Sequence, residues 1–272
     1  MNAVVRQPVV LLGASNLTIG WPDVTRALQS GLSAPVDLFV ALGMGRSYVD
    51  WSRYFARRLP GIMRCGLWNS LHEAHASPSH SPASPAAADR SALPPLVLLT
   101  DIGNDLVYGR TPEQIAESVE DCMMRLRSWN ADCRILATEL PLYSLNSMSR
   151  FRFVVARRLL FPKSLIQFPD VLSDAERLNQ LIHDAASRHQ VQMIRPLDHW
   201  YGMDPIHIRR PLRYDAFRHL FSHWEGYQAS DSILTVSEKP PLPSAAARIV
   251  FGKPRLSSQP VFQGCRLRVS GF

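Results

Sequence analysis

The sequence has few cysteines and no long hydrophobic run, and both absences exclude classes of protein. Its cysteines, Cys65, Cys122, Cys133 and Cys265, form neither a CxxC pair nor a Cys/His cluster with zinc-ligand spacing. We therefore expect free thiols, no bound metal and no other cofactor. No stretch approaches the roughly 18 uninterrupted apolar residues of a membrane span. No secretory leader precedes the first apolar run, so we expect a cytoplasmic protein.

Acidic residues are outnumbered by basic ones. The chain has 23 Asp and Glu against 30 Lys and Arg, which gives a formal net charge of +7. This excess permits an anionic partner or substrate without requiring one. No zinc finger, aromatic RNA-binding motif or basic zipper accompanies it, so we expect no nucleic-acid partner. Apolar residues make up 46% of the 272 residues, which is enough for a sizeable core.

Apolar runs alternate with amphipathic stretches along the chain. The runs predict strands at 7–13, 36–42, 96–100, 134–139 and 191–194. The amphipathic stretches predict helices at 21–32, 48–59, 111–129, 172–188 and 212–227, with Thr111 as a helix cap. This alternation is typical of an α/β protein, and we expect a doubly wound, five-stranded, mostly parallel sheet covered on both faces.

Two segments do not fit the alternating pattern. Residues 72–94 are rich in Ser, Pro and Ala, and we expect a disordered surface insertion. Residues 229–272 carry prolines and scattered polar residues after the last predicted helix, and we expect a loosely ordered tail. The sequence thus predicts one domain over 1–228, followed by that tail.

Ser15 directly follows the first apolar run, in Gly13-Ala14-Ser15. A serine at the carboxyl end of the first parallel strand stands where open α/β sheets place reacting groups. Alone, such a serine is equally typical of a helix cap. A nucleophile also needs a base and a group that orients the base.

The segment Asp204-Pro205-Ile206-His207 supplies both residue types after the last predicted strand. A turn of this spacing brings the Asp204 carboxylate to Nδ1 of His207, which leaves Nε2 free to take the Ser15 proton. The same four residues also suit a plain surface turn. We take Ser15, Asp204 and His207 as the candidate catalytic residues, and this assignment needs no metal.

Attack on a carbonyl also needs donors for the oxyanion that forms. The backbone N–H groups of Ser15 and Gly45 and the side-chain amide of Asn104 are the candidates. Glycine suits this role because its missing Cβ lets a substrate approach the backbone. Gly43 is an alternative to Gly45, and Asn104 alone is also typical of an Asx turn.

Together, these blocks resemble those of the SGNH hydrolases, also called GDSL esterases and lipases. Ser15 matches the block I serine, Gly45 the block II glycine, Asn104 the block III asparagine, and Asp204 with His207 the block V pair. The resemblance spans residues 8 to about 226. It implies a flavodoxin-like three-layer α/β/α sandwich and a cofactor-independent serine hydrolase that acts on acyl esters or thioesters.

The sequence departs from this pattern at two positions. Ala14 replaces the usual aspartate of Gly-Asp-Ser, and Ile102 replaces the first glycine of the block III motif. Two alternatives to hydrolysis therefore stay open. One is an O-acyltransferase that uses the same triad, and the other is a binding protein with a decayed site.

The segment 149–168 mixes aromatic and aliphatic residues with arginines. Such a pattern predicts either an amphipathic helix packed on the sheet or a lid beside the site. Together with Arg46 and Arg209, its arginines favour an anionic acyl ester or thioester as the small-molecule substrate.

Overall fold

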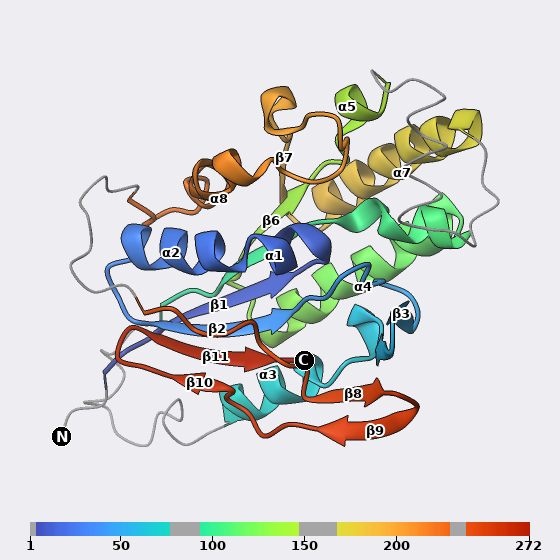
Figure 1. Cartoon of the computed structure of the whole chain (residues 1–272). Coiled ribbons are helices and arrows are strands. Elements are labelled where there is room, and N and C mark those ends of the chain that lie inside the picture. The colour runs from blue at the N-terminus through green and yellow to red at the C-terminus, as the bar shows by residue number, and fades with distance from the viewer. Residues whose placement is uncertain (1–3, 77–92, 147–167, 229–237) are drawn as a thin grey trace.

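A central sheet organises the molecule (Figure 1). The computed structural model describes residues 4–76, 93–146, 168–228 and 238–272. The sheet contains β1 (Gln7–Leu12), β2 (Val36–Ala41), β5 (Leu96–Leu99), β6 (Arg134–Thr138), β7 (Gln192–Ile194), β10 (Phe262–Gln263) and β11 (Leu267–Gly271). Its seven strands follow the order β10-β11-β2-β1-β5-β6-β7. Every neighbouring pair is parallel except β10 with β11.

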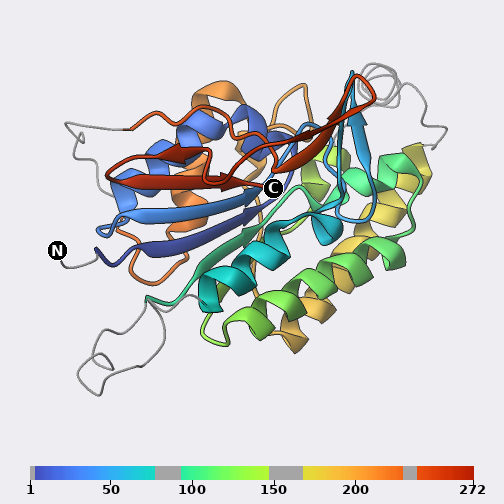
Figure 2. The same cartoon turned by 90° about the horizontal axis from the view of Figure 1, so that it is seen from below.

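Helices cover both faces of this sheet (Figure 2). The helices α1 (Ser15–Ile19), α2 (Trp21–Gly31) and α8 (Arg213–Phe221) lie on one face. The helices α3 (Leu67–Ala76), α4 (Pro112–Trp129), α5 (Leu142–Asn146) and α7 (Phe168–Arg188) lie on the other. Short 3-10 helices span Ile62–Arg64, Ile102–Tyr108, Asp198–Trp200 and Arg210–Leu212.

The side chains of β1 show how one strand serves two cores. Val9 and Leu11 pack in the cluster that contains α2 and α8, whereas Val10 and Leu12 pack in the cluster that contains α4 and α7. Successive side chains of a strand point to opposite faces, and all four are fully buried. A continuous apolar run is therefore what a central parallel strand requires.

Five of the parallel strands, β2-β1-β5-β6-β7, run in the flavodoxin-like order, in which the second strand along the chain lies outside the first. The fold class predicted from the sequence is confirmed. The predicted strand number is wrong, because the sheet has seven strands rather than five. The strand order reverses between β1 and β5, and open sheets of this kind bind their ligands at the carboxyl edge of that reversal.

The expectation of a loosely ordered tail over 229–272 is wrong for the described residues 238–272. These residues form β8 (Ala247–Val250), β9 (Lys253–Leu256), β10 and β11. In β11, which pairs with β2, Leu267 and Val269 are fully buried, and Arg268 forms an ion pair with Asp37. The sequence did not indicate β11, because its pairing partner β2 lies more than two hundred residues earlier in the chain.

The predicted helix at 48–59 is also wrong. This stretch forms β3 (Ser52–Tyr54) and β4 (Arg57–Leu59), which join β8 and β9 in a second, four-stranded antiparallel sheet ordered β3-β4-β8-β9. Backbone pairing of Arg58 with Ile249 decides the conformation, and this partner also lies far along the chain. Local propensity is a weak guide where long-range pairing is available.

The other segments fall partly outside the described residues. The proposed insertion at 72–94 begins inside α3, which continues to Ala76, and residues 77–92 lie outside the described residues. Most of the segment 149–168 lies outside them as well. The predicted start of α4 is confirmed, since Thr111 caps the helix with a capping box and Pro112 follows at the first helical position. No helix of the described chain is long and apolar enough to cross a membrane.

We predict that Leu267→Ala lowers the free energy of unfolding by about 2–5 kcal/mol, because it opens a cavity beneath β11. Urea denaturation measures this change. Leu256→Ala is the matched control, since Leu256 lies in the same carboxyl-terminal segment but is 84% exposed, whereas Leu267 is fully buried. The control is expected to change stability by less than about 0.5 kcal/mol. Equal, small effects of both substitutions would contradict the placement of β11.

Candidate active site

Three predicted residues from distant parts of the chain meet at the carboxyl edge of the sheet. Ser15 is the first residue of α1, directly after the turn that follows β1. His207 and Asp204 lie in the loop between the 3-10 helices Asp198–Trp200 and Arg210–Leu212. Ser15 Oγ lies 2.9 Å from Nε2 of His207, and Nδ1 of His207 lies 2.7 Å from Oδ2 of Asp204. Hydroxyl, imidazole and carboxylate thus form one continuous hydrogen-bonded chain.

Asp204 organises its own turn as well as the histidine ring. Its Oδ1 accepts the backbone N–H groups of Ile206 and His207, each at 3.2 Å, while Oδ2 accepts Nδ1–H of His207. Burial alone would raise the pKa of Asp204, but the hydrogen bonds and charge of His207 lower that pKa below its usual value. An ionised Asp204 holds the proton on Nδ1, so Nε2 is left to accept the Ser15 proton.

Asn16, which the sequence analysis missed, clamps the histidine loop. Its Nδ2 donates to the carbonyl of Ile206 at 2.9 Å, and its Oδ1 accepts the N–H of Ile208 at 2.9 Å. The two contacts flank His207 on both sides. Because Asn16 directly follows Ser15, one short helix carries the candidate nucleophile and fixes the backbone of its base.

Asp101, also missed, anchors that short helix from the next strand. Its Oδ2 accepts the N–H groups of Ala14 (2.8 Å) and Asn16 (3.1 Å), and its Oδ1 accepts Nδ2 of Asn16 (2.7 Å). The N–H of Ser15 lies between these two in sequence and has no acceptor among the described residues. In the SGNH motif that this chain resembles, an aspartate stands at the position of Ala14. In this chain the Asp101 carboxylate, which follows β5, contacts the same turn.

Asp101 itself adopts a left-handed backbone conformation with φ of 58°. Such a conformation is uncommon outside glycine, although aspartate tolerates it better than most residues. In the sequence, the only sign of this role was a carboxylate two residues after the apolar run 96–99 and two residues before Gly103.

Asn104 lines a cavity beside Ser15, and its Nδ2 is buried without a hydrogen-bond partner among the described residues. A buried amide without a partner is rare and costly unless a ligand or water satisfies it. The neighbouring Asp105 is buried and accepts the N–H of Tyr48 at 2.8 Å, which ties this segment to the loop that contains Gly45. Burial raises the pKa of Asp105 to about 6.

Gly45 lies in a turn that only glycine fits well. Its φ is +60°, and a Cβ there would lie 2.4 Å from the hydroxyl oxygen of Tyr108, which donates to the Gly45 carbonyl at 2.8 Å. Gly45 is not among the residues that line the cavity, so its part in an oxyanion hole stays a prediction. At Gly43, the alternative, a Cβ would lie 2.4 Å from Leu59.

The expectation that Arg46 faces an anionic substrate is wrong. Arg46 is fully buried, and its guanidinium donates to the carbonyls of Leu42, Pro60 and Phe272. It therefore fastens the Gly45 loop to the carboxyl-terminal strand region instead of binding a ligand. Arg209 is exposed beside the histidine loop, and the arginines of 149–168 lie outside the described residues.

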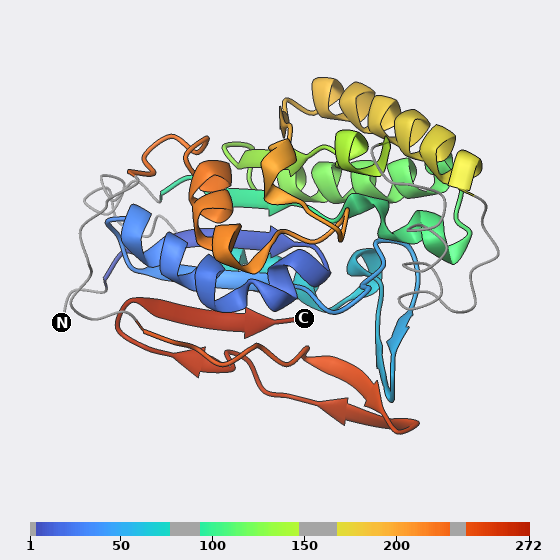
Figure 3. The same ribbon diagram turned by 45° about the horizontal axis from the view of Figure 1, so that its top comes forward.

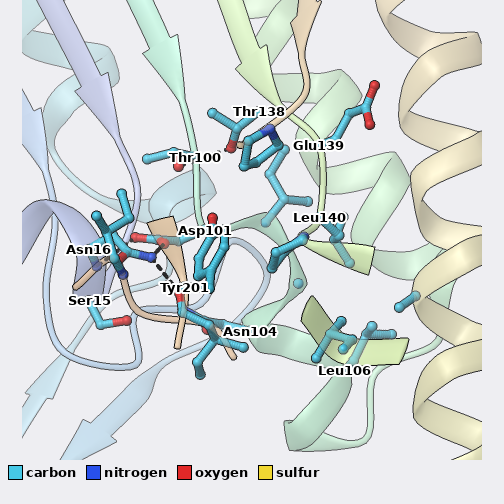
Figure 4. A pocket seen from close by; sticks show the side chains of 18 of the residues that line it. Ser15, Asn16, Thr100, Asp101, Asn104, Leu106, Thr138, Glu139, Leu140 and Tyr201 are labelled. Carbon is cyan, nitrogen blue, oxygen red and sulfur yellow. Dashed lines mark hydrogen bonds between the residues drawn. The ribbon is translucent and has the colours of Figure 1, made fainter. Parts of the chain in front are cut away.

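The cavity beside Ser15 has a volume of about 110 Å³. Figure 4 shows Ser15 and Asn16 at one side of it and Leu106 and Leu140 at the other. Beyond the polar groups near Ser15, its lining is mainly apolar and includes Leu106, Leu140, Leu145, Val171, Trp200 and Ile206. The polar groups around Ser15 therefore border a mainly apolar chamber.

No protein-family model matches the chain, and no curated protein matches it. It is similar to the solved structure of Est24, a carbohydrate acetylesterase from Sinorhizobium meliloti, at 16% identity over 79% of this chain and 97% of that one, with a TM-score of 0.48. It is also similar to an aryl esterase of M. smegmatis, at 19% identity over 79% of this chain and 97% of that one, with a TM-score of 0.47. A third similarity is to the psychrotrophic esterase EstA from Pseudoalteromonas sp., at 10% identity over 79% of this chain and 97% of that one, with a TM-score of 0.44.

We predict that Asn16→Ala lowers kcat for ester hydrolysis by about 10- to 100-fold with little change in KM, because the loop of His207 loses its two backbone anchors. Steady-state kinetics with p-nitrophenyl acetate measures the effect. Asn130→Ala, at the far end of α4, is the control and is expected to keep wild-type kcat. If Asn16→Ala kept wild-type kcat, the clamp would have no catalytic consequence.

Proposed function

We propose that this protein is an SGNH-type serine hydrolase that cleaves an acyl ester or thioester through an acyl-serine intermediate. The observation that carries the proposal is the hydrogen-bonded chain from Ser15 through His207 to Asp204, with distances of 2.9 Å and 2.7 Å. An alcohol, an imidazole and a carboxylate in that order are what an activated serine requires.

In the first half of the reaction, Ser15 Oγ attacks the carbonyl carbon while Nε2 of His207 takes the hydroxyl proton. The imidazolium that forms is stabilised by the Asp204 carboxylate. The negative charge on the carbonyl oxygen is met by Nδ2 of Asn104 and the N–H of Ser15, which lack other partners among the described residues, and by the N–H of Gly45. Breakdown passes the proton from His207 to the leaving alkoxide or thiolate.

In the second half, water replaces the leaving group. His207 takes a proton from the water, whose oxygen attacks the acyl carbon, and the Ser15 oxygen leaves with the proton that His207 returns. The products are a carboxylic acid and the free enzyme. No metal or cofactor takes part in this scheme.

The lining of the cavity favours a substrate whose acyl group, the part nearest Ser15, is apolar. Its walls beyond Ser15 and Asn104 are formed largely by aliphatic and aromatic side chains, such as those of Leu106, Leu140 and Trp200. Apolar pockets with a few convergent polar groups are typical of small-molecule sites.

Ser15→Ala is expected to lower p-nitrophenyl acetate hydrolysis by about 10³-fold or more, because it removes the attacking oxygen. Ser187→Ala, on the exposed face of α7, is the matched control and is expected to keep full activity. Circular dichroism checks that both variants fold. A fluorophosphonate probe is expected to label the wild type at Ser15 and to leave Ser15→Ala unlabelled. Wild-type turnover by Ser15→Ala would refute the proposal.

A further inference from the structure

Two hairpin tips of the second sheet present exposed phenylalanines side by side. Phe55 lies in the turn between β3 and β4 and is 81% exposed, and Phe251 lies in the turn between β8 and β9 and is 84% exposed. The N–H of Phe251 donates to the carbonyl of Ala56 at 2.9 Å, so the two tips touch. Figure 3 shows them extending together away from the central sheet.

Both phenylalanines adopt an unfavourable backbone conformation. Each has a φ of 50°, which is uncommon for any residue with a bulky side chain and strains the turn. Neither side chain gains burial in return, because both are almost fully solvated. Backbone strain and exposed aromatic surface at two adjacent tips both raise the free energy of the folded chain. A partner that buries the aromatic rings would offset this cost.

The strands behind the tips carry positive charge only. Residues 51–61 and 241–260 contain five arginines and one lysine but no aspartate or glutamate. Among them, Arg57, Arg58, Lys253 and Arg255 are exposed and form no ion pair with a carboxylate of the described chain. Every residue of β9 is exposed, so this part of the sheet has no core beneath it.

We propose that this four-stranded sheet is a docking surface for an anionic lipid membrane. The aromatic tips enter the interface between headgroups and acyl chains, and the arginines behind them bind lipid phosphates. Apolar tips backed by guanidinium groups match the layered polarity of a bilayer surface. The tips are separated from the apolar cavity, so the inference does not depend on the proposed catalytic activity.

Other partners fit this surface less well. A second copy of the chain would bring two sets of arginines together, and such like-charge contacts disfavour association. Single-stranded nucleic acid is bound by aromatic rings spread along a basic groove. Here the most exposed rings of the described residues, those of Phe55 and Phe251, lie in two turns that contact each other.

The route of the chain makes the surface relevant to the site. The loop that contains Gly45 leads through residues 48–51 into β3, so one short segment joins the candidate oxyanion region to the first hairpin. The candidate oxyanion region and the proposed docking surface thus belong to one continuous stretch of chain.

The test is sedimentation of the full chain with vesicles of phosphatidylcholine alone or mixed with phosphatidylglycerol. The wild type is expected to bind the anionic vesicles, and to bind them less as salt rises. The double variant Phe55→Asn/Phe251→Asn is expected to bind them at least about tenfold more weakly. Asparagine tolerates this backbone conformation, so the tips keep their shape. Arg57→Ser/Arg255→Ser is expected to weaken binding and to flatten its salt dependence.

Two controls separate this proposal from the catalytic one. Met124→Ser removes an exposed apolar side chain from α4 and is expected to leave vesicle binding unchanged. Ser15→Ala is expected to bind vesicles like the wild type, and the asparagine double variant to hydrolyse p-nitrophenyl acetate like the wild type. Absence of vesicle binding, or equal binding by the double variant, would overturn the proposal. Binding of single-stranded RNA, or self-association through the tips, in place of vesicle binding would also overturn it.

Discussion

The carboxylate of Asp101 is the contact on which the geometry of the site depends. It accepts the N–H groups of Ala14 and Asn16 and also the side-chain amide of Asn16, which in turn holds the loop around His207. One carboxylate therefore links three chain segments: the turn after β1, the end of β5 and the histidine loop. Without that link, Asn16 would still contact the histidine loop, but neither its side-chain amide nor the turn before Ser15 would be anchored to the end of β5.

The fold explains why these segments meet. In the order β2-β1-β5-β6-β7, the chain leaves β1 and β5 in opposite directions, so the loops after these strands separate and open a crevice. Ser15 follows β1, and Asp101 and Asn104 follow β5. The buried guanidinium of Arg46 then fastens the Gly45 loop to the carbonyl of Phe272, which makes the carboxyl-terminal segment part of the support of the site.

Features that short, local sequence patterns encode could be predicted from the sequence alone. Apolar runs that end at Gly or a polar residue predicted five of the six parallel strands. The order of the motif blocks predicted Ser15, Asp204 and His207 as candidate catalytic residues. The sequence did not predict β11 or β4, because these short strands pair with partners far along the chain. It also missed β3, which pairs only with β4. The clamp of Asn16 and Asp101 was missed for a related reason, since its contacts join side chains and backbone across three separate loops.

The central claim is that Ser15 carries the acyl group during turnover. The most direct measurement mixes the protein rapidly with p-nitrophenyl acetate and stops the reaction with acid within the first turnover. Mass spectrometry of the peptides then locates the acetyl group. The account predicts an acetyl group on Ser15 within the first turnover, and none on this residue in a His207→Ala variant. Release of nitrophenol with no acetylated peptide, or with the acetyl group on a different residue, would contradict it.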